Sequence, residues 1–433
     1  MTSTVAEKST DRGRIVAWGL WDWGSAAFNA VATTFVFTVY ITGEAFGEEA
    51  TVSAQLGWAL GLAGVIVLLI APVTGQRSDT SGRRKLWLAI NTGVVVVCLA
   101  LMYFVQPSQD YLLLGLILLA VGTVFFEIAG VNYNAMLTQI STPKTVGRVS
   151  GFGWGMGYIG GIVLLLIVYF GFIKPDVGLF GVTSDDGLSV RVSMVIAAIW
   201  FAVFALPVLF VVPEYRAPDA KARERVGFFR SYAVLGRDIA RLWRTSRQTV
   251  YFLLASAIFR DGLTGVFTFG GVLAAGTFGF SPGDVIIFAI AANVVAGIST
   301  MSVGYLDDRL GAKPVIVTAL IGLIVSGSLV FLLHAGGTTI FWVFGLALCL
   351  FVGPAQSASR TFLARLIPEG REGEVFGLYA TTGRAATFLA PTAWALFITI
   401  GGAQYWGILG IVLVLLIGLL LLIPVKANQD KLS

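Results

Sequence analysis

Long apolar stretches recur from one end of the 433-residue chain to the other, and they restrict its fold more than any other feature. A helix of roughly 20 apolar residues crosses the hydrocarbon core of a bilayer. Charged residues make up only 12% of the chain, against roughly 25% in soluble domains. The pattern predicts an all-α polytopic membrane protein with spans near 15–42, 52–74, 86–106, 111–141, 149–173, 190–212, 249–275, 284–305, 314–334, 340–366, 375–400 and 405–425.

The basic residues predict how these spans are oriented. If the amino terminus lies inside, the predicted outer loops hold only Lys174 and Arg191 of the 29 Lys and Arg residues. Loops rich in Lys and Arg stay in the cytoplasm, so both termini are expected there. The first span is too long for a signal-peptide core, and we expect it to be retained. These features predict a multi-pass protein of the plasma (inner) membrane.

The longest polar segment, 213–248, separates six predicted spans from six others. Apolar residues recur in it at helical spacing, and arginines occupy another face, which predicts an amphipathic helix on the membrane surface. The predicted organisation is a cytoplasmic tail (1–14), an N-terminal six-helix bundle (15–212), a cytoplasmic linker with the amphipathic helix (213–248), a C-terminal six-helix bundle (249–425) and a second cytoplasmic tail (426–433).

The two halves share a motif. GQRSDTSGRRK follows the second span of the first half, GYLDDRLGAK follows the second span of the second half, and both fit G-x-x-x-D-x-x-G. A duplicated six-helix unit is a common transporter plan. Glycine permits a sharp turn, and the carboxylate can accept from helix N–H groups or an arginine; alternatively, the charges serve topology alone. The predicted conformational gate loops contain Gly75, Asp79, Gly82, Arg83, Arg84, Gly304, Asp308, Arg309 and Gly311.

Ionisable residues interrupt several of the predicted spans. They are Asp22, Glu127, Arg260, Asp261, Arg360 and Arg384. Because an ionised group at bilayer depth is costly, such residues mark functional sites or ion pairs. Asp22, Glu127 and Asp261 are therefore candidates either for binding a proton in one conformation or for salt bridges that form and break between conformations. The expected pairs are Asp22 with Arg260 or Arg384, and Glu127 with Arg360 or Arg384.

Other intramembrane residues are candidates for binding a solute. Arg260, Arg360 and Arg384 can hold a carboxylate through two parallel hydrogen bonds. The amides of Asn29, Asn132, Asn134 and Gln356 both donate and accept, which suits a zwitterion or a hydroxylated solute, although hydrogen bonding between helices is the alternative. Trp21, beside Asp22, can shelter an ammonium group or simply pack. Gly353-Pro354 and Ala390-Pro391 are expected to kink or loosen spans 10 and 11.

Several of these motifs resemble a known family. The twelve spans, the duplication and the G-x-x-x-D-x-x-G-R-R loop resemble the major facilitator superfamily. WDWGSAAF at 21–28, NYNAML at 132–137, GFGWGMGYIGG at 151–161 and RDGLTGVFTFGG at 260–271 look like its UMF1 branch, which is related to the Atg22-like vacuolar effluxers. The resemblance implies two pseudo-symmetric six-helix bundles, a central cavity lined by spans 1, 4, 7 and 10, and export of amino acids or other small solutes by alternating access.

Together these features predict a secondary active transporter that moves a small polar solute, an amino acid or similar zwitterion, with proton coupling and in the efflux direction. A facilitator of a sugar, peptide, vitamin or drug, or a non-transporting receptor of the same shape, is the alternative. The chain has one histidine, two cysteines and no nucleotide-binding P-loop, so an enzyme is not expected. No cofactor, metal or nucleic acid is expected; the partners are the solute, protons and the bilayer, and the protein is expected to be a monomer.

Overall fold

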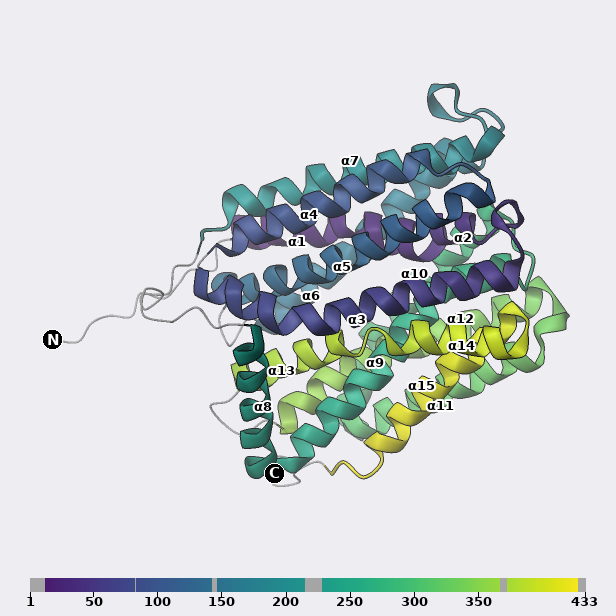
Figure 1. Ribbon diagram of the computed structural model, residues 1–433. Helices are drawn as coiled ribbons and strands as arrows, with labels where there is room; N and C mark the ends of the chain where they lie inside the picture. Colours follow the sequence, from purple (N-terminus) through teal and green to yellow (C-terminus); the bar gives the residue numbers. More distant parts are fainter. Residues whose placement is uncertain (1–11, 82, 142–145, 215–227, 367–371, 427–433) are drawn as a thin grey trace.

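The computed structural model describes residues 12–81, 83–141, 146–214, 228–366 and 372–426 (Figure 1). Within these residues, twelve helical segments are long and apolar enough to cross a membrane. They are Arg12–Ile41, Glu49–Ile70, Arg84–Phe104, Gln109–Leu137, Val149–Ile173, Asp185–Val211, Arg247–Ala275, Pro282–Thr300, Ala312–Leu332, Thr338–Leu366, Gly377–Gly401 and Gln404–Leu422. The twelve-span, all-helical architecture predicted from the sequence is confirmed.

The first six spans, here called the first half, are built from nine helical elements. They are α1 (Arg12–Ala26), the π-helical η1 (Ala27–Phe35), α2 (Phe37–Ile41), α3 (Glu49–Ser81), α4 (Arg84–Leu101), α5 (Gln109–Ile140), α6 (Val146–Val168), the π-helical η4 (Tyr169–Ile173) and α7 (Leu188–Val211). Short 3₁₀ turns at Glu44–Phe46, Met102–Phe104, Leu179–Gly181 and Asp185–Gly187 lie in its connections.

The last six spans, here called the second half, follow α8 (Phe228–Thr245). They are α9 (Arg247–Ala275), α10 (Pro282–Leu310), α11 (Ala312–Leu332), α12 (Thr338–Leu366), the pair α13 (Glu372–Ala385) and α14 (Leu389–Gly401), and α15 (Gly407–Leu422), with 3₁₀ turns at His334–Gly336 and Gln404–Trp406. We call the end of the bundle where α1 begins, α15 ends and α8 lies the terminal end, and the opposite end the far end (Figure 1).

Helix α8 runs across the terminal end, roughly perpendicular to the spans, and packs on α3 and α9 (Figure 1). Leu242 is buried under it, whereas Arg237 and Arg241 are exposed on its other side. The amphipathic helix predicted in the segment between the halves is therefore present.

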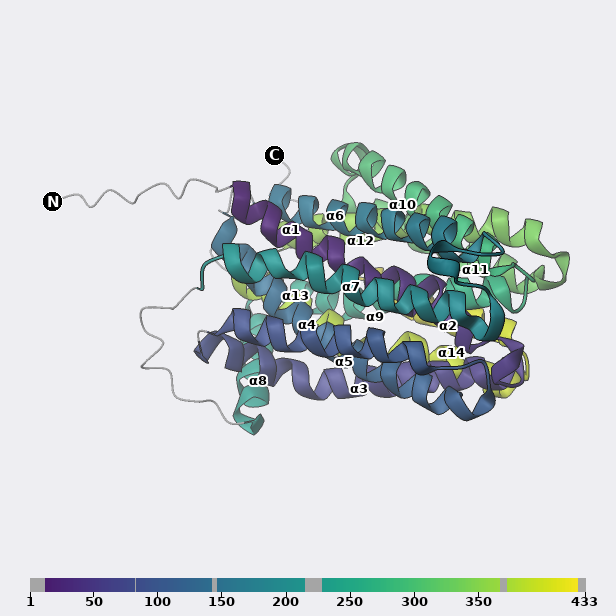
Figure 2. The ribbon, with the colours of Figure 1, turned by 90° about the horizontal axis from the view of Figure 1, so that it is seen from above.

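Each half packs mainly on itself, and a few helix pairs join the two halves. In the first half α1 packs on α6 and α7; in the second half α9 packs on α15, and α11 on α12. Between the halves, α3 packs on α14, η1 on α9, and α6 on α10. Figure 2 shows α6 and α10 along one side of the bundle and α3 along the opposite side. The halves therefore meet along two seams and near the middle of span 1.

Glycines on α3 let the two halves approach closely along one seam. A Cβ atom on Gly61 would lie 2.6 Å from Thr392 Oγ1, and one on Gly64 would lie 2.6 Å from the backbone nitrogen of Phe388. Small residues at this spacing allow helix backbones to come into contact in a membrane. These glycines lie near the middle of span 2, where Gly64 meets the main chain of Phe388 and Gly61 meets the side chain of Thr392.

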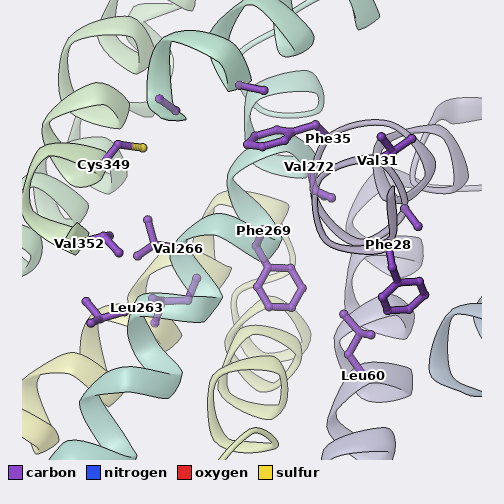
Figure 3. Close-up of a cluster of buried hydrophobic side chains, with 14 of the residues drawn as sticks. Phe28, Val31, Phe35, Leu60, Leu263, Val266, Phe269, Val272, Cys349 and Val352 are labelled. Carbon is purple, nitrogen blue, oxygen red and sulfur yellow. The ribbon is translucent and has the colours of Figure 1, made fainter. Parts of the chain in front are cut away.

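An apolar cluster fills the space between span 1 and span 7. Figure 3 shows Phe28 and Phe35 of the first half on the side that faces Phe269 and Val272 of α9, with Leu60 of α3 below them. All five side chains are almost fully buried. This cluster excludes water from the middle and the far-end part of the interface.

A buried amide completes the contact at the far end. Gln404 is 3% exposed; its Nε2 donates to Ser53 Oγ of α3 at 2.9 Å. Its Oε1 accepts from the backbone N–H of Thr277 at 3.0 Å and from the hydroxyl of Thr277 at 2.8 Å. Trp394 Nε1 donates to the carbonyl oxygen of Ser53 at 3.2 Å. Ser53 thus joins the first half to two separate elements of the second half.

The predicted gate loops are largely helical, and here the sequence interpretation was wrong. Helix α3 continues through Ser81 and α10 through Leu310. A 33-residue helix is about 50 Å long at ~1.5 Å per residue, well beyond the ~30 Å hydrocarbon core, so its polar end remains helical outside the apolar layer.

What remains of each connection is short. Gly311, after α10, has a φ of +86°, a backbone conformation that favours glycine. Arg83 is exposed, and Arg84 Nη1 donates to the carbonyl oxygen of Ala135 at 3.1 Å. Gly82 lies outside the described residues, and Gly75, Asp79, Gly304 and Asp308 lie outside those whose side chains are described.

Candidate functional site

Asp22 of α1 is held by an aromatic cluster inside the first half. Its Oδ2 accepts a hydrogen bond from the hydroxyl of Tyr133 on α5 at 2.8 Å. The Tyr133 ring stacks against Trp18 and Trp21, with centroid distances of 4.4 and 4.3 Å. A Cβ on Gly153 of α6 would lie 2.8 Å from Asp22 Oδ2, so the glycine leaves room for the carboxylate. Three helices therefore fix the position of this acid.

Glu127 and Arg384 form an ion pair between the halves. Arg384 Nε of α13 donates to Glu127 Oε2 of α5 at 3.1 Å. Their side chains are 17% and 27% exposed respectively. A Cβ on Gly130 would lie 2.9 Å from Arg384 Nη2, so the guanidinium lies directly against this glycine of α5. The structure confirms one of the two expected partners for Glu127.

The expected partners for Asp22 were wrong. Arg384 is engaged by Glu127, and Arg260 Nη1 donates to the carbonyl oxygen of Tyr379 at 3.2 Å. The Arg260 guanidinium also lies over the Tyr379 ring, 4.1 Å from its centroid. Asp22 accepts from a phenol instead, because α1 turns its carboxylate toward α5 rather than toward α9 or α13.

Asp261 is buried beside Arg260 and makes contact with a broken helix. It is 4% exposed, and its Oδ2 accepts from the backbone N–H of Ala390 at 2.5 Å. Span 11 is interrupted between α13 and α14, so Ala390 lies in the first turn of a new helix. The first N–H groups of a helix lack internal partners and favour a nearby carboxylate. Asp261 of span 7 therefore caps the second part of span 11.

The break in span 11 agrees with the kink predicted from Ala390-Pro391. Proline has no N–H to donate, and it is well tolerated in the first turn of a helix. Arg260 and Asp261 have different partners, as expected for neighbouring residues that project about 100° apart on a helix. Span 10, by contrast, continues through Pro354 as the single helix α12.

Arg360 of α12 reaches across to the first half. Its guanidinium lies over the Trp154 ring of α6, 4.9 Å from the centroid. It makes no hydrogen bond and no ion pair within the part of the chain that the structure describes. Arg360 and Asp22 attract each other electrostatically across the interface. Arg360, a cation with free donors, thus contacts Trp154, and Gly153, the residue before Trp154, lies against the carboxylate of Asp22.

The remaining solute-binding candidates differ in their surroundings. Asn132 is buried; its Nδ2 donates to the carbonyl oxygen of Ile128 at 3.0 Å, and its Oδ1 has no partner among the described residues. Asn134 is exposed, and its amide donates to the carbonyl oxygen of Gly130 at 2.8 Å. Asn29 is exposed and Gln356 half-buried. The two span 4 amides each use a donor within α5.

Trp21 is 2% exposed, and its Nε1 donates to Thr92 Oγ1 at 3.1 Å. Its N–H has a partner, and its ring stacks on Tyr133 and Phe126. Trp21 is therefore placed to pack between helices rather than to shelter an ammonium group.

Span 1 changes its helical form just beyond Asp22. From Ala27 to Phe35 it is π-helical, and the N–H of Val36 donates to the carbonyl oxygen of Val31 at 3.1 Å. The hydroxyl of Thr34 donates to the carbonyl oxygen of Asn29 at 2.7 Å. π-Helical segments are rare and occur frequently at functional sites. This one lies where span 1 packs on α9, between Asp22 and the far end.

Sequence reasoning missed Tyr133 and Tyr379 as site residues. Tyr133 lies inside the NYNAML motif, between two asparagines that were selected because they are amides. Tyr379 accepts from Arg260 and bonds to Ser359 through its hydroxyl at 2.8 Å. Tyr133 could have been selected from the sequence, because it lies in a motif whose other polar residues were already candidates.

The fold matches that of solved transporters. A D-xylose–proton symporter superposes with a TM-score of 0.67 at 15% identity, covering 94% of this chain and 96% of that one. The nucleoside transporter NupG gives a TM-score of 0.61 at 13% identity, covering 96% of this chain and 100% of that one. The chain therefore shares the twelve-span fold of these two transporters.

Sequence comparison gives the family. The model described as "Vacuole effluxer Atg22 like" matches residues 38–432. The chain belongs to the Atg22-like family of MFS-type transporters.

Its relatives include the uncharacterized MFS-type transporter YxiO of Bacillus subtilis (strain 168), 24% identical over 420 residues, 96% of this chain and 95% of YxiO. Autophagy-related protein 22 of Cryptococcus neoformans var. neoformans serotype D (strain B-3501A) is 24% identical over 303 residues, 66% of this chain. That match spans about half of the fungal protein, 54% of its length. The family description names an effluxer and YxiO is described as an MFS-type transporter; neither description is of an enzyme.

Proposed function

We propose that this protein is a secondary active transporter that moves an amino acid or a similar small zwitterion by alternating access. The observation that carries the proposal is the placement of Asp22 and Arg360, opposite charges on opposite halves that attract each other without forming an ion pair in the part of the chain that the structure describes. A zwitterion between them would bind its carboxylate to the free donors of Arg360 and its ammonium to Asp22 and the neighbouring aromatic faces.

The state of the buried acids supports proton coupling as part of this proposal. Asp22 and Asp261 lie at membrane depth, and neither forms an ion pair within 4 Å among the described residues. A carboxylate that has lost water and lacks a cation partner is unstable, so a change of conformation can be accompanied by proton binding or release. We infer that the carboxylate of Asp22 binds either a proton or the solute. We also infer that protonation of the Asp261 carboxylate on α9 changes the position of α14.

The orientation and direction of transport are part of the same proposal. Lys and Arg residues gather in segments at the terminal end, which supports a cytoplasmic position for that end. Closure of the far end then corresponds to a state that is closed to the outside. The family description as effluxers favours export. We propose a monomer in the plasma (inner) membrane. Its two six-helix bundles (15–212 and 249–425) move as units joined by the 213–248 linker. The segments around Asp79 and Asp308 act as gates.

Currents on a solid-supported membrane test the proposal. The protein is reconstituted in liposomes and exposed to concentration jumps of an amino-acid panel at about pH 6 and pH 8, with Asp22→Asn alongside. Asp110→Asn is the matched control, because Asp110 is exposed at the far-end start of α5. We expect a pH-dependent current for some amino acids that is lost in Asp22→Asn and kept in Asp110→Asn.

Uptake of labelled amino acids covers electroneutral transport in the same vesicles. If no amino acid crosses in either assay, the amino-acid proposal is wrong, and a solute of another class, or a receptor role, takes its place.

A further inference from the structure

We propose that the solute carries two carboxylate groups, which Arg260 and Arg360 bind together, with an acidic amino acid as the best-fitting member of this class. The inference rests on the proposed function, because it assumes that the solute binds between the halves. It goes further because it assigns the net charge of the solute. One acid and one arginine in the site would not by themselves determine that charge.

The charge balance within the membrane is the first step. The six ionisable residues singled out within the spans are three acids and three arginines, but the structure does not pair them one to one. Glu127 engages Arg384 at 3.1 Å. Asp261 faces the amino end of α14, and Asp22 accepts from Tyr133. Among the described residues, neither of the two remaining arginines has an acid within 4 Å.

Arg260 is held in place by its neighbours, but none of the contacts that the described residues make with its guanidinium neutralises its charge. Its contacts are a carbonyl oxygen and a ring face, both of Tyr379, and neither carries a full negative charge. A Cβ on Gly383 would lie 2.6 Å from Arg260 Nη1, so the chain keeps this space open for the guanidinium. One nitrogen is used by the carbonyl, which leaves the other donors of the fork available to a ligand.

Arg360 lies in the same cluster as Arg260. The hydroxyl of Tyr379 bonds to Ser359 Oγ at 2.8 Å, and Ser359 immediately precedes Arg360. The two guanidinium groups repel each other. Two like charges held close together at membrane depth are costly until an anion arrives, and an arginine fork matches a carboxylate. This arrangement is suited to a ligand with more negative charge than a neutral zwitterion.

The set of charged groups also distinguishes among dianions. A dicarboxylate neutralises both arginines, and Asp22, held by Tyr133 on the opposite half, is positioned to receive an ammonium group on the same molecule. An amino dicarboxylate uses all three charged groups, whereas a plain dicarboxylate leaves Asp22 without a charged partner. A neutral amino acid uses one arginine and leaves the other without an anion.

Isothermal titration of the purified full chain in nanodiscs tests this inference. The probes are L-aspartate, its neutral amide L-asparagine, and succinate, which lacks the amine. We expect aspartate to bind about 10- to 100-fold more tightly than asparagine, because charge-assisted hydrogen bonds to the second carboxylate are lost in the amide. Arg260→Gln and Arg360→Gln should each remove this preference.

Arg191→Gln is the matched control. Arg191 makes the same kind of contacts at the far end: its Nε donates to the carbonyl oxygen of Tyr103 at 2.6 Å, and its guanidinium lies 4.8 Å from the Tyr103 ring centroid. Its loss should leave the preference intact. Arg260→Lys and Arg360→Lys, which keep the charge without the fork, should retain part of it, and thermal unfolding shows which variants are folded.

The outcomes separate the two levels of the proposal. Equal binding of aspartate and asparagine, or unchanged aspartate preference in folded Arg260→Gln, would overturn the two-carboxylate inference while leaving a zwitterion transporter standing. Equal binding of succinate and aspartate would support two carboxylates and remove the role of the amine. If aspartate, asparagine and succinate all fail to bind, the two-carboxylate inference is wrong; if the amino-acid panel also fails to cross the liposome membrane, the proposed function fails with it.

Discussion

The two ends of the interface between the halves are held in different ways. From the middle of the bundle toward the far end the contacts involve main chain, as where Gly64 meets the backbone of Phe388 and Gly271 meets the carbonyl oxygen of Thr34. Toward the terminal end they are made by the tips of long side chains, as in the Glu127–Arg384 pair and in Arg360 over Trp154.

This difference shows which contacts can change easily. A side-chain contact is broken by rotation about single bonds, whereas a main-chain contact is broken only when whole helices move. The structure is therefore a state closed at the far end, in which the terminal end is held by charged and aromatic side chains. An alternating-access cycle needs the far-end contacts to open and the terminal-end contacts to rearrange. Four substitutions test this comparison, from the largest expected effect to the smallest.

Gly64→Ala should damage the main-chain contact between the halves most. The added methyl group would lie 2.6 Å from Phe388 N and 2.7 Å from its Cα, and backbone atoms have little freedom to move away. Overpacking of this kind costs about 1–3 kcal/mol, which corresponds to a shift of up to about 100-fold in the balance between closed and open states. Transport rate and far-end cysteine accessibility measure it.

Gly93→Ala is the control for this change, because a Cβ at Gly93 meets nothing within 4 Å. The main-chain account of this contact is wrong if Gly64→Ala behaves like Gly93→Ala in both assays.

Glu127→Gln should weaken the terminal-end contact, with about a 30-fold loss of transport, because Arg384 is left at membrane depth without its carboxylate. The exchange Glu127→Arg with Arg384→Glu should recover part of the activity, since the opposite charges are again side by side. Transport by each single variant and by the exchange gives the coupling between the two residues. Additive losses, without recovery in the exchange, would contradict a functional ion pair.

Tyr133→Phe should alter the chemistry of the site without touching either contact between the halves. It removes one charge-assisted hydrogen bond to Asp22 and keeps the ring between Trp18 and Trp21. We expect about a 10-fold loss of transport together with a changed pH dependence. Tyr111→Phe is the control for this substitution, because Tyr111 lies at the far-end start of α5. An unchanged pH profile in Tyr133→Phe would exclude Tyr133 as a positioning residue for Asp22.

Gln404→Met should have the smallest effect, about 5-fold on the balance between states. It keeps most of the side-chain volume but removes the hydrogen bonds to Ser53 and Thr277. The far end should open more readily, so cysteines placed there should react faster, whereas the terminal end should be unaffected. Equal changes in reactivity at both ends would mean that Gln404 acts on overall stability and not on the far-end contact.

The sequence was sufficient for the features that arise within one segment. The length of the apolar stretches predicted the twelve spans. The helical spacing of apolar residues predicted α8, and Pro391 predicted the break in span 11. The G-x-x-x-D-x-x-G motif misled because glycines and polar residues are tolerated in a helix that continues outside the bilayer.

The contacts between helices were harder to predict. Which way Asp22 points depends on how α1 is rotated in the bundle, and no local pattern fixes that rotation; its true partner is a neutral tyrosine. The π-helical part of span 1 was also not visible, because its sequence is as apolar as that of an ordinary helix. Glu127 and Arg384 were matched correctly only as one of two possibilities.

Spin-label distances at the two ends test the central claim most directly. Labels at Val177 and Leu332 report the far end, and labels at Leu86 and Leu310 the terminal end; all four positions are exposed. The buried Cys98 and Cys349 are first replaced by alanine. Alternating access predicts that solute or a change of pH lengthens the far-end distance while it shortens the terminal-end distance. Distances that change in the same direction, or not at all, while solute is transported would contradict it.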